Sequence, residues 1–260
     1  MSTRFQFNKG PLFDGGSPRD MSLVAYEPGI YLAETTQRFI PGTRYITWDG
    51  RVFKYSLATG TVGGGRLAYH KADVATYGVA YTTVGDTQVA GDRQITIDTQ
   101  TFVEDVLAGG LVLLYGADYT YVQQRGIIGN DAVSGTTVTI NLDAPLITGI
   151  TEDSTGIEVQ PNPYRYIGIV ETYGSCSGLP CTRATSGQFF WQQTWGMCNV
   201  EPGMTIGASS LDRQLVTGYG AGAVYYHDTT HAITDQCQHA GYILDSGNAP
   251  VPFVMLQISI

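Results

Sequence analysis

Lysine is nearly missing from this chain of 260 residues, which contains only Lys9, Lys54 and Lys71. Charged residues of all four types make up just 14% of the sequence. Because the exposed faces of helices are normally rich in Lys and Glu, this shortage argues against a mainly helical protein. The 33 glycines and 17 tyrosines instead suit turns and pleated strands. The composition therefore predicts an all-β fold.

Positive charge is also scarce, since 14 basic residues stand against 23 acidic ones and the net charge is -9. Such a chain repels a phosphate backbone, so no nucleic-acid partner is expected. The charge is distributed unevenly. Residues 1–54 hold seven basic and five acidic residues, a net +2, which leaves -11 for the other 206 residues. Two interpretations stay open: chance, or a first segment that faces a different partner from the rest.

Long apolar runs and cysteine are the other shortages. No run approaches the roughly 18 apolar residues of a membrane-spanning helix, and the N-terminus lacks the apolar core of a signal peptide. We therefore expect synthesis in the cytoplasm of the cell that translates it and no membrane partner. Four cysteines are too few for a disulfide scaffold in a chain of this length. Cys176, Cys181, Cys198 and Cys237 are expected to be thiols, with a Cys176–Cys181 bridge left open under oxidising conditions.

The strongest local signal is Asp49-Gly50, which stands between the β-prone runs Ile46–Trp48 and Arg51–Tyr55. Asp-Gly favours a type I′ turn, in which both central residues need a positive φ. The sequence therefore predicts a β-hairpin here.

Alternating apolar residues continue this pattern to the end of the chain. Val138, Ile140 and Leu142 alternate with polar neighbours, and the last residues from Val254 to Ile260 do the same. Such period-two alternation predicts strands with one buried face and a paired C-terminal strand. A short stretch, Thr101–Leu107, is the one helical candidate, so no crossover helices are available for a parallel doubly wound sheet.

These signals predict an antiparallel sandwich or barrel preceded by a different kind of segment. Residues 1–58 are rich in proline, glycine and isolated aromatics, which indicates an extended N-terminal arm ending in the hairpin. The alternative is a set of loops folded over the chain's own core. Residues 59–260 form the β-domain, with lobes 59–150 and 151–260 as an option, divided near the acidic turn at 151–156.

No motif predicts catalysis, a metal site or a cofactor. His227, His231, Cys237 and His239 are metal-ligand types, but a strand would keep the first two apart. Cys176 lies in a Gly-Ser-Cys-Ser-Gly sequence like a nucleophile elbow, yet Leu-Pro follows where a helix is required. The acidic pairs Glu104-Asp105 and Glu152-Asp153 indicate solvated turns, and Gly63–Arg66 lacks the residues of a phosphate-binding loop.

Two parts of the chain resemble a known family. One is Pro41–Tyr55, and the other is the series of segments Gly203–Gly207, Val224–Tyr226, Ala240–Leu244 and Val254–Ile260. This order is similar to the small β-domain of capsid decoration (cement) proteins of tailed phages. The resemblance implies a non-enzymatic virion protein on the capsid exterior, bound to the major capsid protein and to copies of itself, for example as a trimer. The stretch 173–198, which smaller members lack, leaves room for an added outward lobe.

The expected contacts with the capsid or other partners are the aromatic and arginine residues of the first segment. They are Phe5, Phe7, Arg19, Tyr26, Arg38, Arg44 and Trp48. Two rivals stay open. One is a carbohydrate-binding or host-attachment β-sandwich that uses Trp191 and Trp195, although Phe189 and Trp191 are predicted more strongly as core residues. The other is a glycan-cleaving enzyme, which needs two carboxylates facing one cleft.

Overall fold

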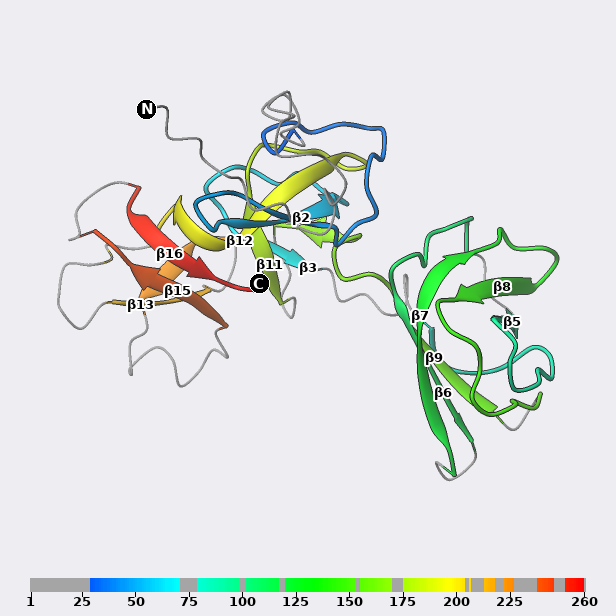
Figure 1. Cartoon of the computed structure of the whole chain (residues 1–260). Coiled ribbons are helices and arrows are strands. Elements are labelled where there is room, and N and C mark those ends of the chain that lie inside the picture. Colours follow the sequence, from blue (N-terminus) through cyan, green and yellow to red (C-terminus); the bar gives the residue numbers. More distant parts are fainter. Residues whose placement is uncertain are drawn as a thin grey trace, which may run out of the picture. The chain divides into compact units, whose positions relative to one another are not determined.

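The computed structural model of the chain describes residues 29–70, 79–98, 102–116, 120–152, 155–169, 175–203, 206, 213–217, 222–226, 238–245 and 251–259. Within these ranges the chain forms strands and turns and no helix. The ladders between strands are antiparallel, which confirms the predicted all-β class. Two compact units are present (Figure 1): unit 1 comprises Met1–Ala72 and Tyr164–Ile260, and unit 2 comprises Asp73–Pro163.

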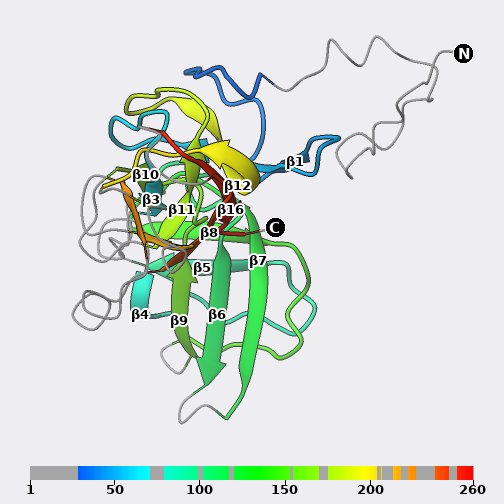
Figure 2. The same cartoon turned by 90° about the vertical axis from the view of Figure 1, so that its left-hand side faces the viewer.

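Unit 2 is a curled six-stranded sheet (Figure 2). Its strands, in spatial order, are β4 (Val79–Thr83), β9 (Thr155–Gln160), β6 (Leu111–Gly116), β7 (Val122–Asn130), β8 (Thr137–Leu142) and β5 (Gln94–Asp98). The two edges of the sheet come together just after β4, where Val84 bridges Ile97 of β5. The sheet therefore curls toward a barrel.

Unit 2 has a core of its own. Val138, Ile140 and Leu142 of β8 are buried, which confirms the alternation predicted for this strand. Ile95 and Ile97 of β5 lie in the same cluster. All the buried members of this cluster fall between residues 84 and 159, so the unit does not borrow core residues from the rest of the chain.

The helix predicted at 101–107 is absent, because residues 104–109 form turns. The Leu107 amide donates to Oδ1 of the buried Asn130 at 2.9 Å, and the Asp105 amide donates to the Asn130 carbonyl at 2.9 Å. Asp105 has a left-handed φ of 57°. Tertiary hydrogen bonds to Asn130 therefore override the local helical pattern.

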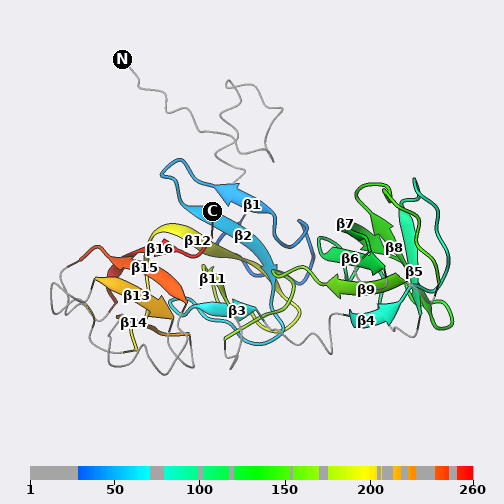
Figure 3. The same cartoon turned by 90° about the horizontal axis from the view of Figure 1, so that it is seen from below.

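Unit 1 contains a ten-stranded sheet (Figure 3). Eight strands follow one another in the order β10 (Ile167–Gly168), β3 (Ala68–His70), β11 (Cys176–Pro180), β12 (Phe189–Asn199), β16 (Phe253–Gln257), β15 (His239–Ile243), β13 (Gln214–Thr217) and β14 (Val224–Tyr226). β2 (Val52–Leu57) also pairs with β12, and β1 (Arg44–Ile46) pairs with β2. β12 is thus the central strand.

Both faces of β12 are buried at its beginning. Phe189, Phe190 and Trp191 are all buried, so the prediction that Phe189 and Trp191 belong to the core is confirmed. The C-terminal strand β16 lies between β12 and β15, which confirms that the end of the chain is paired. The cysteine-bearing stretch, where described, contributes β11, β12 and the loop between them to the sheet of unit 1, so these two strands belong to the main sheet and not to an added lobe.

Unit 2 interrupts unit 1 between β3 and β10. These strands are paired neighbours, with Ile167 opposite His70 and Gly168 opposite Tyr69. The chain therefore leaves unit 1 and returns to it at adjacent positions. The acidic turn at 151–156, where the sequence suggested a division into lobes, leads into β9, which pairs with β6 inside unit 2.

β1 and β2 form the hairpin predicted from Asp49-Gly50. The predicted type I′ turn is wrong, because Gly50 has a φ of 82° whereas Asp49 does not have a positive φ. The Gly50 amide donates to the Thr47 carbonyl, and the Thr47 amide donates to the Arg51 carbonyl, both at 3.0 Å. This closes a three-residue loop, Trp48-Asp49-Gly50, in which only the glycine needs the left-handed region.

Residues 29–43 lie over the core of unit 1 as irregular loop. Ile30 is buried in the cluster that contains Trp191, and Phe39 packs against it. The ring of Phe39 lies 5.3 Å from that of Tyr55 and 5.5 Å from that of Trp191, centroid to centroid. The Glu34 amide donates to the Phe189 carbonyl at 2.9 Å. Residues 1–28, the first part of the predicted arm, are outside the described residues.

Candidate binding surface

Three of the seven predicted interface residues, Arg38, Arg44 and Trp48, are described by the structure. The others, Phe5, Phe7, Arg19 and Tyr26, lie outside the described residues. Arg38 is engaged within its own loop, since its Nη2 donates to Glu34 Oε1 at 2.8 Å and its amide donates to the Tyr55 hydroxyl at 3.1 Å. Its charge is therefore neutralised, and its backbone holds the loop against Tyr55.

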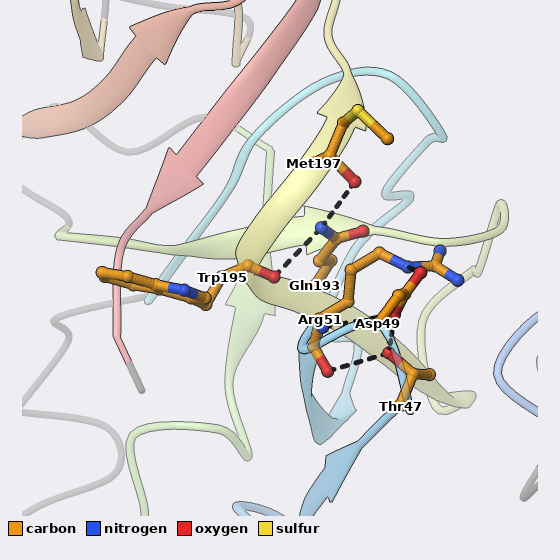
Figure 4. A network of polar contacts seen from close by, with 6 residues as sticks. All are labelled: Thr47, Asp49, Arg51, Gln193, Trp195 and Met197. Atoms are coloured by element: carbon orange, nitrogen blue, oxygen red, sulfur yellow. Dashed lines mark hydrogen bonds and ion pairs between the residues drawn. The ribbon is translucent and has the colours of Figure 1, made fainter. Parts of the chain in front are cut away.

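Trp48 is at the tip of the hairpin and is 70% exposed. The loop beneath it is held by side chains (Figure 4): the Thr47 hydroxyl donates to the Asp49 carboxylate, and Arg51 Nε donates to Asp49 Oδ2 at 2.8 Å. Burial alone would raise the pKa of Asp49, but the hydrogen bonds from Thr47 and Arg51 outweigh it and hold that pKa below its ordinary value. A rigid loop thus presents a large aromatic ring to solvent.

Arg44 and Lys54 are opposite each other on β1 and β2. The backbone bonds of the hairpin fall on Thr43, Tyr55, Thr47 and Arg51, so Arg44 and Lys54 form a non-hydrogen-bonded pair, in which side chains are closest. Burial and the charge of Arg44 together lower the pKa of Lys54. Among the described residues no carboxylate forms a salt bridge with either cation. We call Arg44, Trp48 and Lys54 the hairpin surface.

A sharp irregularity in β12 supports the base of the hairpin. The register with β2 shifts between Gln193 and Trp195. The buried Gln193 amide donates from Nε2 to the carbonyls of Trp195 and Met197, both at 3.1 Å (Figure 4). Gly196 has a φ of 100°, and a Cβ there would lie 2.8 Å from Arg51 Cγ. A glycine is therefore required where the hairpin meets β12.

A cavity of about 530 Å³ lies beside this junction and is lined by residues of unit 1. Its walls combine the Asp49–Arg51 ion pair with apolar side chains such as Phe53 and Phe253 and with the thiols of Cys181 and Cys198. Because the arginine is already paired with a carboxylate, the cavity offers no free charge from that pair. The cavity therefore has a mixed polar and apolar lining, in which the charges of Asp49 and Arg51 offset each other.

The thiols near this cavity are poor nucleophiles. Burial raises the pKa of Cys176, Cys181 and Cys198 to about 12. All three are free cysteines, so the Cys176–Cys181 bridge that was left open is not formed. Cys176 lies in strand β11 rather than before a helix, as expected for an inert thiol. Cys237 lies outside the described residues.

We expect these thiols to react very slowly with 5,5′-dithiobis(2-nitrobenzoate) in the native protein at pH 8. With a pKa near 12, only about one thiol in ten thousand is a thiolate at that pH. Unfolding in guanidinium should make them react within minutes. A Cys237→Ser variant restricts the count to the three described thiols, and fast reaction of all three in that native variant would contradict the burial argument.

The other residues considered for catalysis, metal binding or sugar binding do not form a common site among the described residues. Glu104, Asp105 and Glu152 lie on exposed turns, and His239 is exposed on β15. Trp191 is 1% exposed and so cannot stack on a sugar, while Trp195 is partly buried. His227, His231 and Asp153 are outside the described residues.

Side chains that could bind a metal are scattered across the part of the chain that the structure describes. There, no group of three or more His, Cys, Asp or Glu residues is placed to hold a metal ion. No helix in those ranges has the length and apolarity for a membrane crossing.

Comparisons with protein-family models, curated proteins and solved structures found no match to this chain.

Sequence reasoning missed a second surface, on unit 2. Three exposed apolar residues share one end of the unit with three exposed carboxylates, and we call this group the acidic end: Val103, Glu104, Asp105, Ile128, Asp131 and Val133. The buried Asn130 holds it together, since its Nδ2 donates to the carbonyls of Val103 and Asp131, both at 2.9 Å. A helix at 101–107, as predicted from the sequence, would not have indicated that these residues lie together.

Charge is divided between the units more strongly than the sequence count at residue 54 suggested. Residues 73–163 contain twelve acidic residues and two arginines, so unit 2 carries -10. Because the whole chain carries -9, unit 1 carries +1. The sequence contains this difference in charge, but the charges can be assigned to two units only when the boundaries of the units are known.

Proposed function

We propose that the protein is a non-enzymatic virion protein of a tailed phage, a decoration protein that binds the outside of the head and bridges major capsid subunits. The observation that carries this proposal is the hairpin surface. Pro41–Tyr55, the segment that resembles cement proteins, includes a preorganised hairpin that exposes Trp48 at its tip. Exposed aromatic residues on a rigid support are common anchors of protein interfaces.

The charge of this segment agrees with a binding role. Residues 29–54 contain four basic and two acidic residues, in a chain whose net charge is -9. The loop that precedes the hairpin also exposes Tyr31, Leu32 and Ile40. An apolar and weakly cationic surface suits contact with a protein shell. Phe5, Phe7, Arg19 and Tyr26 would extend the same contact as part of the N-terminal segment.

The proposal includes a place of action and a set of partners. The protein is made in the host cytoplasm and acts on the capsid exterior, where it contacts the major capsid protein and further copies of itself. It needs no cofactor, because its role is mechanical. The buried thiols and the ion pair of Asp49 and Arg51 then serve structure rather than chemistry.

Co-sedimentation with undecorated capsids of the phage that encodes the protein tests this function. We expect stoichiometric binding, and a Trp48→Ala variant that binds at least about tenfold more weakly because an exposed anchor is lost. Ile147→Ala, which changes a similarly exposed apolar residue of unit 2, is the matched control and should bind normally. Absence of wild-type binding would refute the proposal. Normal binding by Trp48→Ala would remove the hairpin from the interface.

A further inference from the structure

We propose that the two cations of the hairpin surface, Arg44 and Lys54, dock on the acidic end of unit 2 in a second copy, while Trp48 at the tip contacts the capsid as in the proposed function. This deepens the proposed function, and for its setting it rests on that function, because it names the contact by which neighbouring copies on a shell would join. The contact pairs two different surfaces, so it is head-to-tail. Such contacts close into a ring or continue as a chain, depending on the rotation between copies.

The first observation is the pair of cations on the hairpin, with which no carboxylate of the described residues forms a salt bridge. Arg44 and Lys54 are directly opposite on adjacent strands, and like charges in that position are destabilising. Partial burial and the nearby charge of Arg44 both lower the pKa of Lys54. The Lys54 Nζ lies 5.7 Å from the centre of the Tyr164 ring, which limits its freedom. An external carboxylate would offset this repulsion.

The second observation is the composition of the acidic end. Val103 is 69% exposed and Ile128 is 61% exposed, on two segments that are joined through the hydrogen bonds of Asn130. Glu104, Asp105 and Asp131 are exposed beside them. Asp105 is the one non-glycine residue with a positive φ among the described residues. The loop is held in this form by Asn130, so the group is preorganised.

The two surfaces match in chemistry. The hairpin offers two cations, and the acidic end offers three carboxylates. The net charges of the whole units also favour this contact, since unit 1 carries +1 and unit 2 carries -10. Opposite potentials speed encounter and fix register between partners. A second copy therefore supplies everything that the contact needs.

Sedimentation velocity of the full-length protein, without capsids, tests the contact over a range of concentrations at low and at high ionic strength. We expect concentration-dependent association that weakens as salt screens the charges. Arg44→Glu should raise the dissociation constant at least about tenfold, as should Glu104→Arg, because each places like charges in contact. Combining both changes should restore association, since the reversed charges attract again.

Glu152→Arg, a charge reversal on another exposed turn of unit 2, is the matched control and should associate normally. Thermal melting of each variant confirms that it is folded; Arg44 and Glu104 are both exposed, so little loss is expected. A monomer at every concentration, or association that neither reversal affects, would overturn the inference. Because no capsid is present, failure here is distinct from failure of the proposed function, which is read from capsid binding alone.

Discussion

Replacing Trp191 by alanine is expected to destabilise unit 1 by about 3–5 kcal/mol, the usual range for removal of a large buried aromatic side chain. Trp191 is 1% exposed. Its ring centroid lies 5.2 Å from that of Tyr55, 5.5 Å from that of Phe39 and 6.0 Å from that of Tyr45. The loop 29–43 and the hairpin are both packed on this ring. Its loss therefore loosens the parts of unit 1 that carry the binding surface.

Guanidinium unfolding measures this loss. Trp48→Ala is the control, because a tryptophan that is 70% exposed should cost less than about 0.5 kcal/mol when it is removed. A small loss for Trp191→Ala, accompanied by loss of binding to a glycan array, would favour the sugar-binding alternative. A large loss without any glycan binding agrees with a core residue.

Unit 2 is expected to fold when it is expressed alone as residues 73–163, and unit 1 is expected to keep its fold when those residues are replaced by a short Gly-Ser linker. Unit 2 is contiguous in sequence and has its own buried cluster. In unit 1, β3 and β10 are paired neighbours, so a short linker can span the gap. The result would be two stable proteins from one chain.

Circular dichroism and thermal melting of the two fragments measure this outcome. Each should unfold cooperatively, near one of the transitions of the full chain. A variant of the full chain that lacks residues 44–57 is the negative control, because the deletion removes β1 and the strand β2 that pairs with the centre of the sheet. Failure of unit 2 to fold alone would show that its stability depends on unit 1.

Local features of the fold could be predicted because neighbouring residues determine them. Asp49-Gly50 predicted the hairpin, and the alternation at Val138–Leu142 predicted the buried face of β8. The turn type was wrong, since the side chains of Thr47 and Arg51 bind Asp49 and stabilise a three-residue loop. The helical candidate failed for a related reason. Its backbone bonds to Asn130, more than twenty residues away in sequence.

The inserted unit and the acidic end could not be predicted in the same way. Pairing of Ile167 with His70 joins positions almost a hundred residues apart, and no local pattern specifies such a register. The resemblance to decoration proteins directed attention to the first segment, in which the structure leaves Arg44 and Trp48 exposed. It gave no reason to examine Val103 or Asp131. Those residues became a candidate surface only when the loop around Asn130 brought them together.

The joint between β3 and β10 has a mechanical consequence. Both polypeptide connections to unit 2 emerge from this one narrow ladder of two residue pairs. Tension applied to unit 2 would therefore act first on the pair Ile167–His70, at the end of the ladder where both connections leave unit 1. β3 is also paired with the strand β11, whereas the other side of β10 has a single bridge, from Ile167 to Ala58, with the Thr59 amide donating to the Ile167 carbonyl at 2.9 Å. Under load β10 should detach first and lengthen the tether, while the central strands around β12 stay in place.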